Sequence, residues 1–453
     1  MGSLVSLLIG EAEEEGAPSL LELLDVDPQN EGNNRMNWER ILRRLRTHPE
    51  EAAAYCHSVD PSPLLRCLSC VEAEIPPAVI QAFLDAYDDT VYHSDRNGQT
   101  PLLQAVRRTA VAWSTDNDDN EEEEDPAERI QKDARQIIQL LLEANPSAAR
   151  HSDSTGAIPL HFARTDPVSA RLLLDAFPQG VHQVDKERGR LPLHYLCSLS
   201  LEKETEENNN NNNEEEEEAP LRLALPNPKV AKLLATPTKT SNPVLATDNE
   251  GLRPLDMMYD GLVTLLTKKN REEDDAFQID TLWQVLTVLV QSVVITSPGK
   301  TFQMVHALVS LRCPAAIMAE ALRRFPDQAV ERDAQGRTPL LIAVAMLQQQ
   351  PQHGGDMCKV ICELLKCNKN AARMTDHEGR LAIDTLAEAG VYDEQLFECL
   401  VKAEPRAVDT RDLKNKQHPF ITAAMAGPDK SNASSVYHLL RAKPHVIQYY
   451  MLD

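Results

Sequence analysis

The chain has 453 residues, nine cysteines and a formal net charge of −24 at pH 7. A chain of this length exceeds what usually folds around a single hydrophobic core. Its negative charge disfavours nucleic acid as a partner, because phosphates would be repelled. The odd number of cysteines, with no signal-peptide pattern before them, argues against a disulfide framework and against secretion, so we expect a cytoplasmic or nuclear protein.

Residues 1–35 combine an acidic stretch with an Asn/Gly cluster, which predicts a disordered acidic N-terminal tail. Its first six residues fit the pattern for N-myristoylation of Gly2. A single acyl chain binds membranes only marginally, and the glutamates that follow would be repelled by anionic lipid. We therefore favour a protein without membrane attachment and keep a membrane-tethered adaptor as an alternative.

The pattern of residues 36–94 predicts a helical segment that caps the N-terminal end of the repeats described below, as a degenerate copy of them. Trp38 to Leu45 has its apolar residues on one helical face and its arginines off that face. Pro63-Leu64-Leu65 opens a second helix, and Pro77 to Tyr87 forms a third. A stack of repeats needs such a cap at its end.

From residue 95 onward, one motif recurs: an aspartate, a glycine three residues later, and then a Pro-Leu pair that opens an apolar stretch. The aspartate binds its own backbone and the glycine adopts a positive φ without steric cost, so the motif predicts a turn before a short helix. Gly98, Gly156 and Gly336 are expected at positive φ. The clear copies begin at Asp95, Asp153 and Asp333, weaker copies begin at Asp248 and Asp376, and the copy at Asp185 has one extra residue before its glycine.

An apolar helical run precedes these turns and is followed by a proline. Pro146, Pro178, Pro326 and Pro405 each lie seven residues before an aspartate, the last of them Asp412. Because proline cannot continue a helix, we interpret it as a stop signal. The repeating unit is therefore a helix, a stop, an extended turn and a short helix.

This unit resembles the ankyrin repeat, whose signature is T-P-L-H-x-A. The resemblance covers most of residues 36–453 and is closest to the degenerate form abundant in microalgae. Only Pro159-Leu160-His161 and Pro192-Leu193-His194 keep the histidine, which in the family bonds backbone and steadies neighbouring turns. The resemblance implies an all-α solenoid of roughly seven to nine stacked helix-turn-helix units with short extended turns.

Two intervals between motifs are much longer than the family period of roughly 33 residues. The run from Asp116 to Asp125 holds eight acids and the run from Glu202 to Glu218 has a net charge of −8, so together they carry most of the net charge. Such runs predict disordered acidic insertions between the two helices of a unit, at 114–128 and 201–220. The expected parts are the tail (1–35), the cap (36–94), repeats with insertions (95–255), a degenerate region with buried helices (256–332), and C-terminal repeats with a cap (333–453).

The degenerate region holds a feature that resembles a phosphate-binding loop. Ser297 to Thr301 reads S-P-G-K-T and follows an apolar run, but Val294 stands where that loop needs its first glycine. We interpret Gly299-Lys300-Thr301 as a decayed turn, and a nucleotide-binding or catalytic segment within 256–332 stays an alternative. The apolar run Leu282 to Ile295 is too short to span a bilayer and predicts a buried helix.

The remaining candidate sites are incomplete. Cys67-x-x-Cys70 and Cys358-x-x-x-Cys362 lack the second half of a zinc site, so we expect these cysteines to pack in the core. Asp116-x-Asp118-x-Asn120 lacks the glycine and the glutamate of a calcium loop. We therefore expect no catalytic residue, no metal and no cofactor.

The sequence favours a monomeric, non-catalytic scaffold or adaptor that binds other proteins, whose identity it does not reveal. In the ankyrin family the turns line the binding face, and the turns here carry several arginines, which recur at interfaces because they pair with carboxylates. The alternative is that these are ordinary solvated turn residues. The candidate partner-binding residues are Arg96, Asn97, Gln99, Lys186, Glu187, Arg188, Gln335, Arg337, His377 and Arg380.

Overall fold

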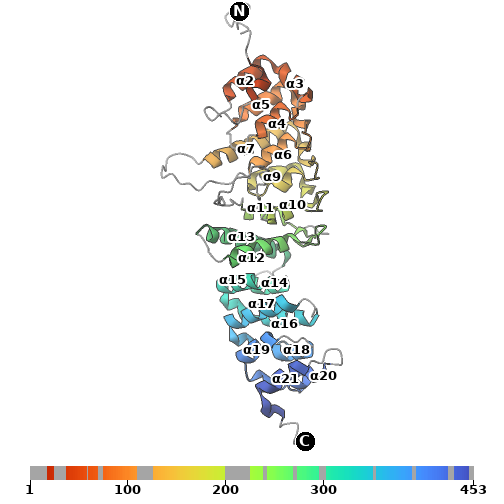
Figure 1. The fold of residues 1–453 in the computed structure, drawn as a ribbon, viewed down its shortest axis with the longest axis vertical. Helices are drawn as coiled ribbons and strands as arrows, with labels where there is room; N and C mark the ends of the chain where they lie inside the picture. The colour runs from red at the N-terminus through yellow and green to blue at the C-terminus, as the bar shows by residue number, and fades with distance from the viewer. Residues whose placement is uncertain are drawn as a thin grey trace, which may run out of the picture. The chain divides into compact units, whose positions relative to one another are not determined.

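The computed structural model describes residues 18–24, 37–58, 60–69, 75–109, 126–198, 225–237, 242–268, 273–294, 302–349, 354–389, 394–426 and 433–447. Within these ranges the regular elements are all helical (Figure 1). The chain divides into two compact units, residues 1–254 and 255–453. The expected all-α class is confirmed for this part of the chain.

The first unit contains two rows of helices. In one row α5, α7, α9 and α11 each pack on the next, and in the other α4, α6, α8 and α10 do the same. Helices α6 and α7, α8 and α9, and α10 and α11 pair between the rows. The helices are α1 (Leu20–Leu24), α2 (Trp38–Thr47), α3 (Pro49–Ser58), α4 (Pro63–Ser69), α5 (Pro77–Ala86), α6 (Pro101–Arg108), α7 (Pro126–Ala144), α8 (Pro159–Phe162), α9 (Pro167–Ala176), α10 (Pro192–Cys197) and α11 (Pro228–Leu234), with short 3-10 helices η1 (Asp88–Tyr92), η2 (Pro146–Arg150), η3 (Pro178–His182) and η4 (Pro243–Leu245).

The second unit repeats the two-row arrangement. Helices α14, α16, α18 and α20 form one row, and α15, α17, α19 and α21 form the other (Figure 1). The helices are α12 (Pro254–Thr267), α13 (Glu273–Val293), α14 (Met304–Ser310), α15 (Ala315–Arg324), α16 (Pro339–Gln349), α17 (Gly354–Cys367), α18 (Ala382–Ala389), α19 (Glu394–Ala403), α20 (Pro419–Met425) and α21 (Ala433–Ala442), with 3-10 helices η5 (Pro326–Ala329), η7 (Lys369–Arg373), η8 (Ala407–Asp409) and η9 (Pro444–Ile447).

The apolar run from Leu282 lies in α13, where Leu282, Leu286 and Leu289 are fully buried, as the sequence predicts. Across the described ranges, none of the helices combines the length and the apolar character needed to cross a bilayer.

The spaced prolines do follow the ends of the long helices, and three of the four also begin a new element; the exception is Pro405, since η8 begins at Ala407. Helix α7 ends at Ala144, Asn145 caps the next turn by accepting the N–H of Ser147 at 3.0 Å, and Pro146 is the first residue of η2. Pro178 and Pro326 begin η3 and η5 in the same way. The fixed φ of proline suits the first position of a helical turn, which explains this second role.

Two predicted boundaries are wrong. Residues 18–24 belong to the packed structure, because Leu20 and Leu24 of α1 are buried and the N–H of Leu20 donates to Glu51 Oε2 at 2.9 Å. The leucines of the L-L-E-L-L segment pack on α2, α3 and α4, which outweighs the acidic composition around them. The first insertion also ends earlier than predicted, since α7 begins at Pro126. The rest of both acidic insertions, and of the tail with Gly2, lies outside the described residues.

Candidate functional site

The candidate site is the set of turns that carry the repeated motif, here called the turn tips: residues 95–99, 153–157, 185–190, 248–252, 333–337, 376–380 and 412–417. In the five tips of the shorter form, Oδ1 of the aspartate accepts the N–H groups of the residues two and four positions later, at 2.8–3.0 Å. The glycines lie at φ of 73° (Gly98), 85° (Gly156) and 76° (Gly336), so their predicted conformation is confirmed.

Two tips have a longer form. The N–H of Asp185 donates to Arg190 O at 3.0 Å, and the N–H of Asp412 donates to Gln417 O at 2.9 Å, five residues further on in both cases. Gly189 supplies the positive φ of 66° in the first, and Lys416 adopts 60° in the second. Because a lysine takes the place of the glycine, the glycine motif does not identify this seventh turn. The distance of seven residues from Pro405 to Asp412 does indicate where the turn lies.

Backbone hydrogen bonds connect consecutive tips of the first unit. In each bond, the N–H of the residue that follows a tip's aspartate donates to a carbonyl of the preceding tip. Four tips are thereby held together by main-chain contacts that do not depend on side chains. The bonds are Ser154 N–H to Asn97 O (3.0 Å), Lys186 N–H to Thr155 O (2.8 Å) and Asn249 N–H to Arg188 O (2.9 Å).

Buried histidines tie the short helices to the next tip. Nδ1 of His161 accepts the N–H of Ile158 at 3.1 Å, so Nε2 carries the proton and donates to Arg190 O at 3.1 Å. His194 makes the same pair of bonds, with Leu191 and with Leu252 O. Burial lowers the pKa of both imidazoles, which keeps them neutral in this role. Both histidines therefore have the structural role that the resemblance implies.

A third buried histidine, missed in the sequence, makes only the bond to the next tip, because its Nδ1 has no hydrogen-bond partner among the described residues. His306 is the third residue of α14, and its Nε2 lies 3.2 Å from Arg337 O. The helix begins at Met304, five residues after Gly299, whereas α6 begins three residues after Gly98. Because of this difference of two residues, an alignment on the glycines does not place His306 at the histidine position of the repeat. The sequence signal that indicates it is the stretch V-H-A-L, which opens α14 after Met304. Gly299-Lys300-Thr301 itself lies outside the described residues.

Replacing His161 by leucine, the residue type that Leu103 and Leu341 place at the same helix position, tests this connection. The variant leaves the Ile158 N–H buried without its acceptor and removes one of the two hydrogen bonds to Arg190 O, so we expect the free energy of unfolding to fall by about 1–3 kcal/mol in urea denaturation. His377→Leu, at an exposed tip position, is the matched control and should change it by less than about 0.5 kcal/mol. Equal effects of the two changes would contradict the connecting role of His161.

The candidate partner-binding residues divide into two groups. Gln99 is only 7% exposed, so its side chain is buried, whereas the sequence analysis expects it at the surface. The Arg96 side chain is 89% exposed, although its Nε lies 2.7 Å from Asp60 Oδ2. The residues that are exposed are Arg96, Asn97, Lys186, Glu187, Arg188, Gln335 and His377.

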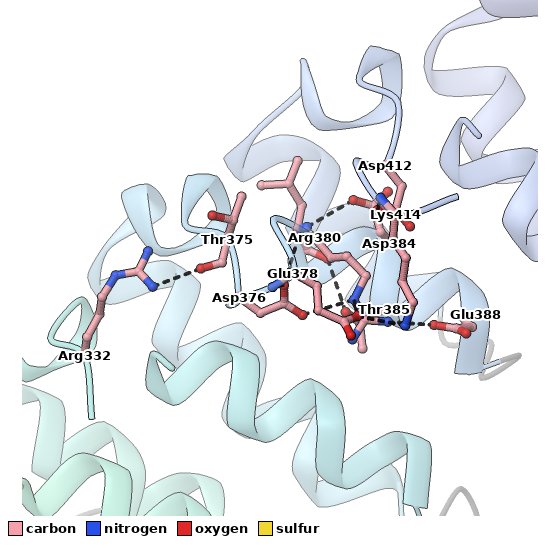
Figure 2. A network of polar contacts seen from close by, with 11 residues as sticks. Arg332, Thr375, Asp376, Glu378, Arg380, Asp384, Thr385, Glu388, Asp412 and Lys414 are labelled. Carbon is pink, nitrogen blue, oxygen red and sulfur yellow. Dashed lines mark hydrogen bonds and ion pairs between the residues drawn. The ribbon is translucent and has the colours of Figure 1, made fainter. Parts of the chain in front are cut away.

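Arg337 and Arg380 stabilise their own turns. An Nη atom of Arg337 lies 2.9 Å from Asp333 Oδ2. The Arg380 side chain is 16% exposed; its Nε is 3.1 Å from Asp376 Oδ2 and its Nη1 is 2.9 Å from Glu388 Oε2 (Figure 2). Because these guanidinium groups already bind carboxylates of the same tip, they are poor candidates for binding a partner.

Among the described residues, no group of three or more histidine, cysteine or acidic side chains is arranged to hold a metal ion. No known protein-family model matches the chain, and no curated protein matches its sequence.

Proposed function

We propose that this chain is an ankyrin-type solenoid that acts as a non-catalytic adaptor and binds another protein across the turn tips of its first unit. The observation that carries the proposal is the series of main-chain hydrogen bonds between consecutive tips, which holds the exposed side chains of different repeats in a fixed arrangement. The two rows of helices and the bridging histidines also fit an ankyrin-type stack.

The charge of the exposed tips indicates the chemistry of the partner. Arg96, Lys186 and Arg188 present three exposed cations on tips that backbone hydrogen bonds connect, against two exposed glutamates, Glu187 and Glu250. Arginine binds carboxylates through two parallel hydrogen bonds, and a fixed array of such groups loses little entropy on binding. The expected partner is a protein segment rich in aspartate and glutamate.

A triple variant tests the proposal. The partner is first captured with the wild-type protein from the native cell, identified by mass spectrometry and purified; its affinity is then measured by titration calorimetry. Arg96→Ala/Lys186→Ala/Arg188→Ala should weaken binding by at least about tenfold, since interface arginines commonly contribute more than 1 kcal/mol each. Its melting temperature should match that of the wild type, because exposed ion pairs add little stability.

The control removes three exposed cations from the same unit but away from the tips: Arg171→Ala/Lys229→Ala/Lys232→Ala, on α9 and α11. This variant should bind as the wild type does. Unchanged binding by the tip variant would place the interface elsewhere, and equal losses in both variants would show a dependence on net charge alone.

A further inference from the structure

Two cysteines from helices that are neighbours in one row of the second unit lie side by side. Cys362 is on α17 and Cys399 is on α19, and these helices pack against each other. Their Sγ atoms are 3.1 Å apart, and both residues are partly exposed. Cys358 is buried as the sequence predicts, but the same prediction is wrong for Cys362.

A lysine lies one helical turn after each cysteine. Lys366 is four residues after Cys362 on α17, and Lys402 is three residues after Cys399 on α19, and residues at these spacings are neighbours on a helix surface. Each lysine also pairs with a glutamate, Glu363 or Glu398, which limits the effect of its positive charge. A neighbouring cation and partial exposure are the features that distinguish reactive cysteines from buried structural ones, because the thiolate is the nucleophile.

We propose that Cys362 and Cys399 form a reversible dithiol–disulfide site that is oxidised by a low-molecular-weight disulfide such as oxidised glutathione. One cysteine thiolate attacks a sulfur of the reagent, which forms a mixed disulfide and releases one small thiol. The thiolate of the second cysteine then attacks the Sγ atom of the first cysteine in this mixed disulfide. This step closes the Cys362–Cys399 bond and releases the second small thiol. The two protons lost by the protein thiols end on the two released thiols, and excess reduced thiol reverses both steps.

The disulfide would join two helices that are neighbours in one row. The sulfur atoms need to approach by only about 1 Å to reach bonding distance. The bond would close a segment of 37 residues and would restrict the unfolded chain, so oxidation should stabilise this pair of helices against separation. Redox state would then control how easily this part of the second unit opens.

The test uses the full-length protein, incubated with oxidised glutathione, quenched with N-ethylmaleimide, digested and mapped by mass spectrometry. A peptide linking Cys362 to Cys399 is expected in the wild type and in Cys367→Ser, which removes the exposed cysteine on the same helix. Cys362→Ser and Cys399→Ser should instead carry one glutathione on the remaining cysteine. Oxidised wild type should melt on the order of 5 °C above the reduced protein, and dithiothreitol should abolish the difference.

Any of three results would overturn the proposal, two of them from the peptide map and one from the melting temperature. One is glutathione attached to Cys362 and Cys399 in the wild type without a link between them, and the other is a link from either cysteine to Cys367 in preference to its neighbour. An equal rise in melting temperature on oxidation of Cys399→Ser would also exclude this disulfide as the cause.

Discussion

Replacing Gly156 by alanine is expected to lower the free energy of unfolding by about 3 kcal/mol or more. Gly156 has a φ of 85°, where an L-residue costs roughly 1–2 kcal/mol. A Cβ atom built there would lie 2.7 Å from the backbone N of Lys186, a group that donates a hydrogen bond to Thr155 O. The next tip must therefore move, and overpacking with loss of this hydrogen bond adds about 1–3 kcal/mol.

Gly251→Ala is the matched control in the same unit. Its φ is 82°, but a Cβ atom there would meet no atom within 4 Å, so this variant should lose only the backbone term of roughly 1–2 kcal/mol. Urea denaturation followed by helical circular dichroism measures both losses. Equal losses would mean that the close approach of consecutive tips does not contribute to stability.

The turns were predictable because their chemistry is local. An aspartate binds N–H groups two and four residues away, and a glycine between them supplies the positive φ, so the motif by itself determines the turn. The prolines are similar, since each acts within a few residues of its own position. The histidines of the P-L-H stretches are local only through Nδ1, because their Nε2 atoms bond to Arg190 O and Leu252 O, far along the chain. The sequence therefore predicts the tips, and the ends of the helices that precede Pro146, Pro178 and Pro326, correctly.

Features that depend on residues far apart in the chain were not predictable in this way. The burial of Gln99 and the pairing of Arg380 with Glu388 depend on how a turn packs on its helices. The sequence pattern relates Cys362 to Cys358, four residues away, whereas the structure places its sulfur beside that of Cys399 on another helix. The composition of the acidic tail also predicts disorder at Leu20, which is buried in α1. A short apolar segment of this kind packs only where other helices present an apolar surface to it, and composition does not show that surface.

A buried carboxyl in the second unit is expected to make stability fall as the pH rises. Asp384 is the third residue of α18, the position that His161 has in α8. It is 3% exposed; its Oδ2 accepts the Leu381 N–H at 3.0 Å, and its Oδ1 is buried with no hydrogen-bond partner among the described residues (Figure 2). Burial raises the pKa of Asp384 to about 7, and the nearby carboxylate of Asp412 acts in the same direction.

The sign of the effect follows from proton binding. Between about pH 4, the ordinary value for an unfolded aspartate, and about pH 7, the folded protein holds a proton that the unfolded chain has lost. This group therefore lowers the free energy of unfolding as the pH rises through that interval, by at most about 4 kcal/mol. Asp384→Asn keeps an oxygen for the Leu381 N–H and cannot ionise, so it should be more stable than the wild type at pH 8.

Chemical denaturation of the wild type and of Asp384→Asn between pH 4.5 and pH 8 measures this contribution directly, because the other titrating groups cancel in the difference. The advantage of asparagine should grow up to about pH 7 and then stay constant. Asp376→Asn is the contrasting control: burial opposes ionisation of Asp376, but the hydrogen bond from the Arg380 N–H and the charge of Arg380 lower its pKa, so this change should destabilise the protein at pH 8. An advantage of Asp384→Asn that does not vary with pH would mean that this carboxyl is hydrated and ionised in the folded state.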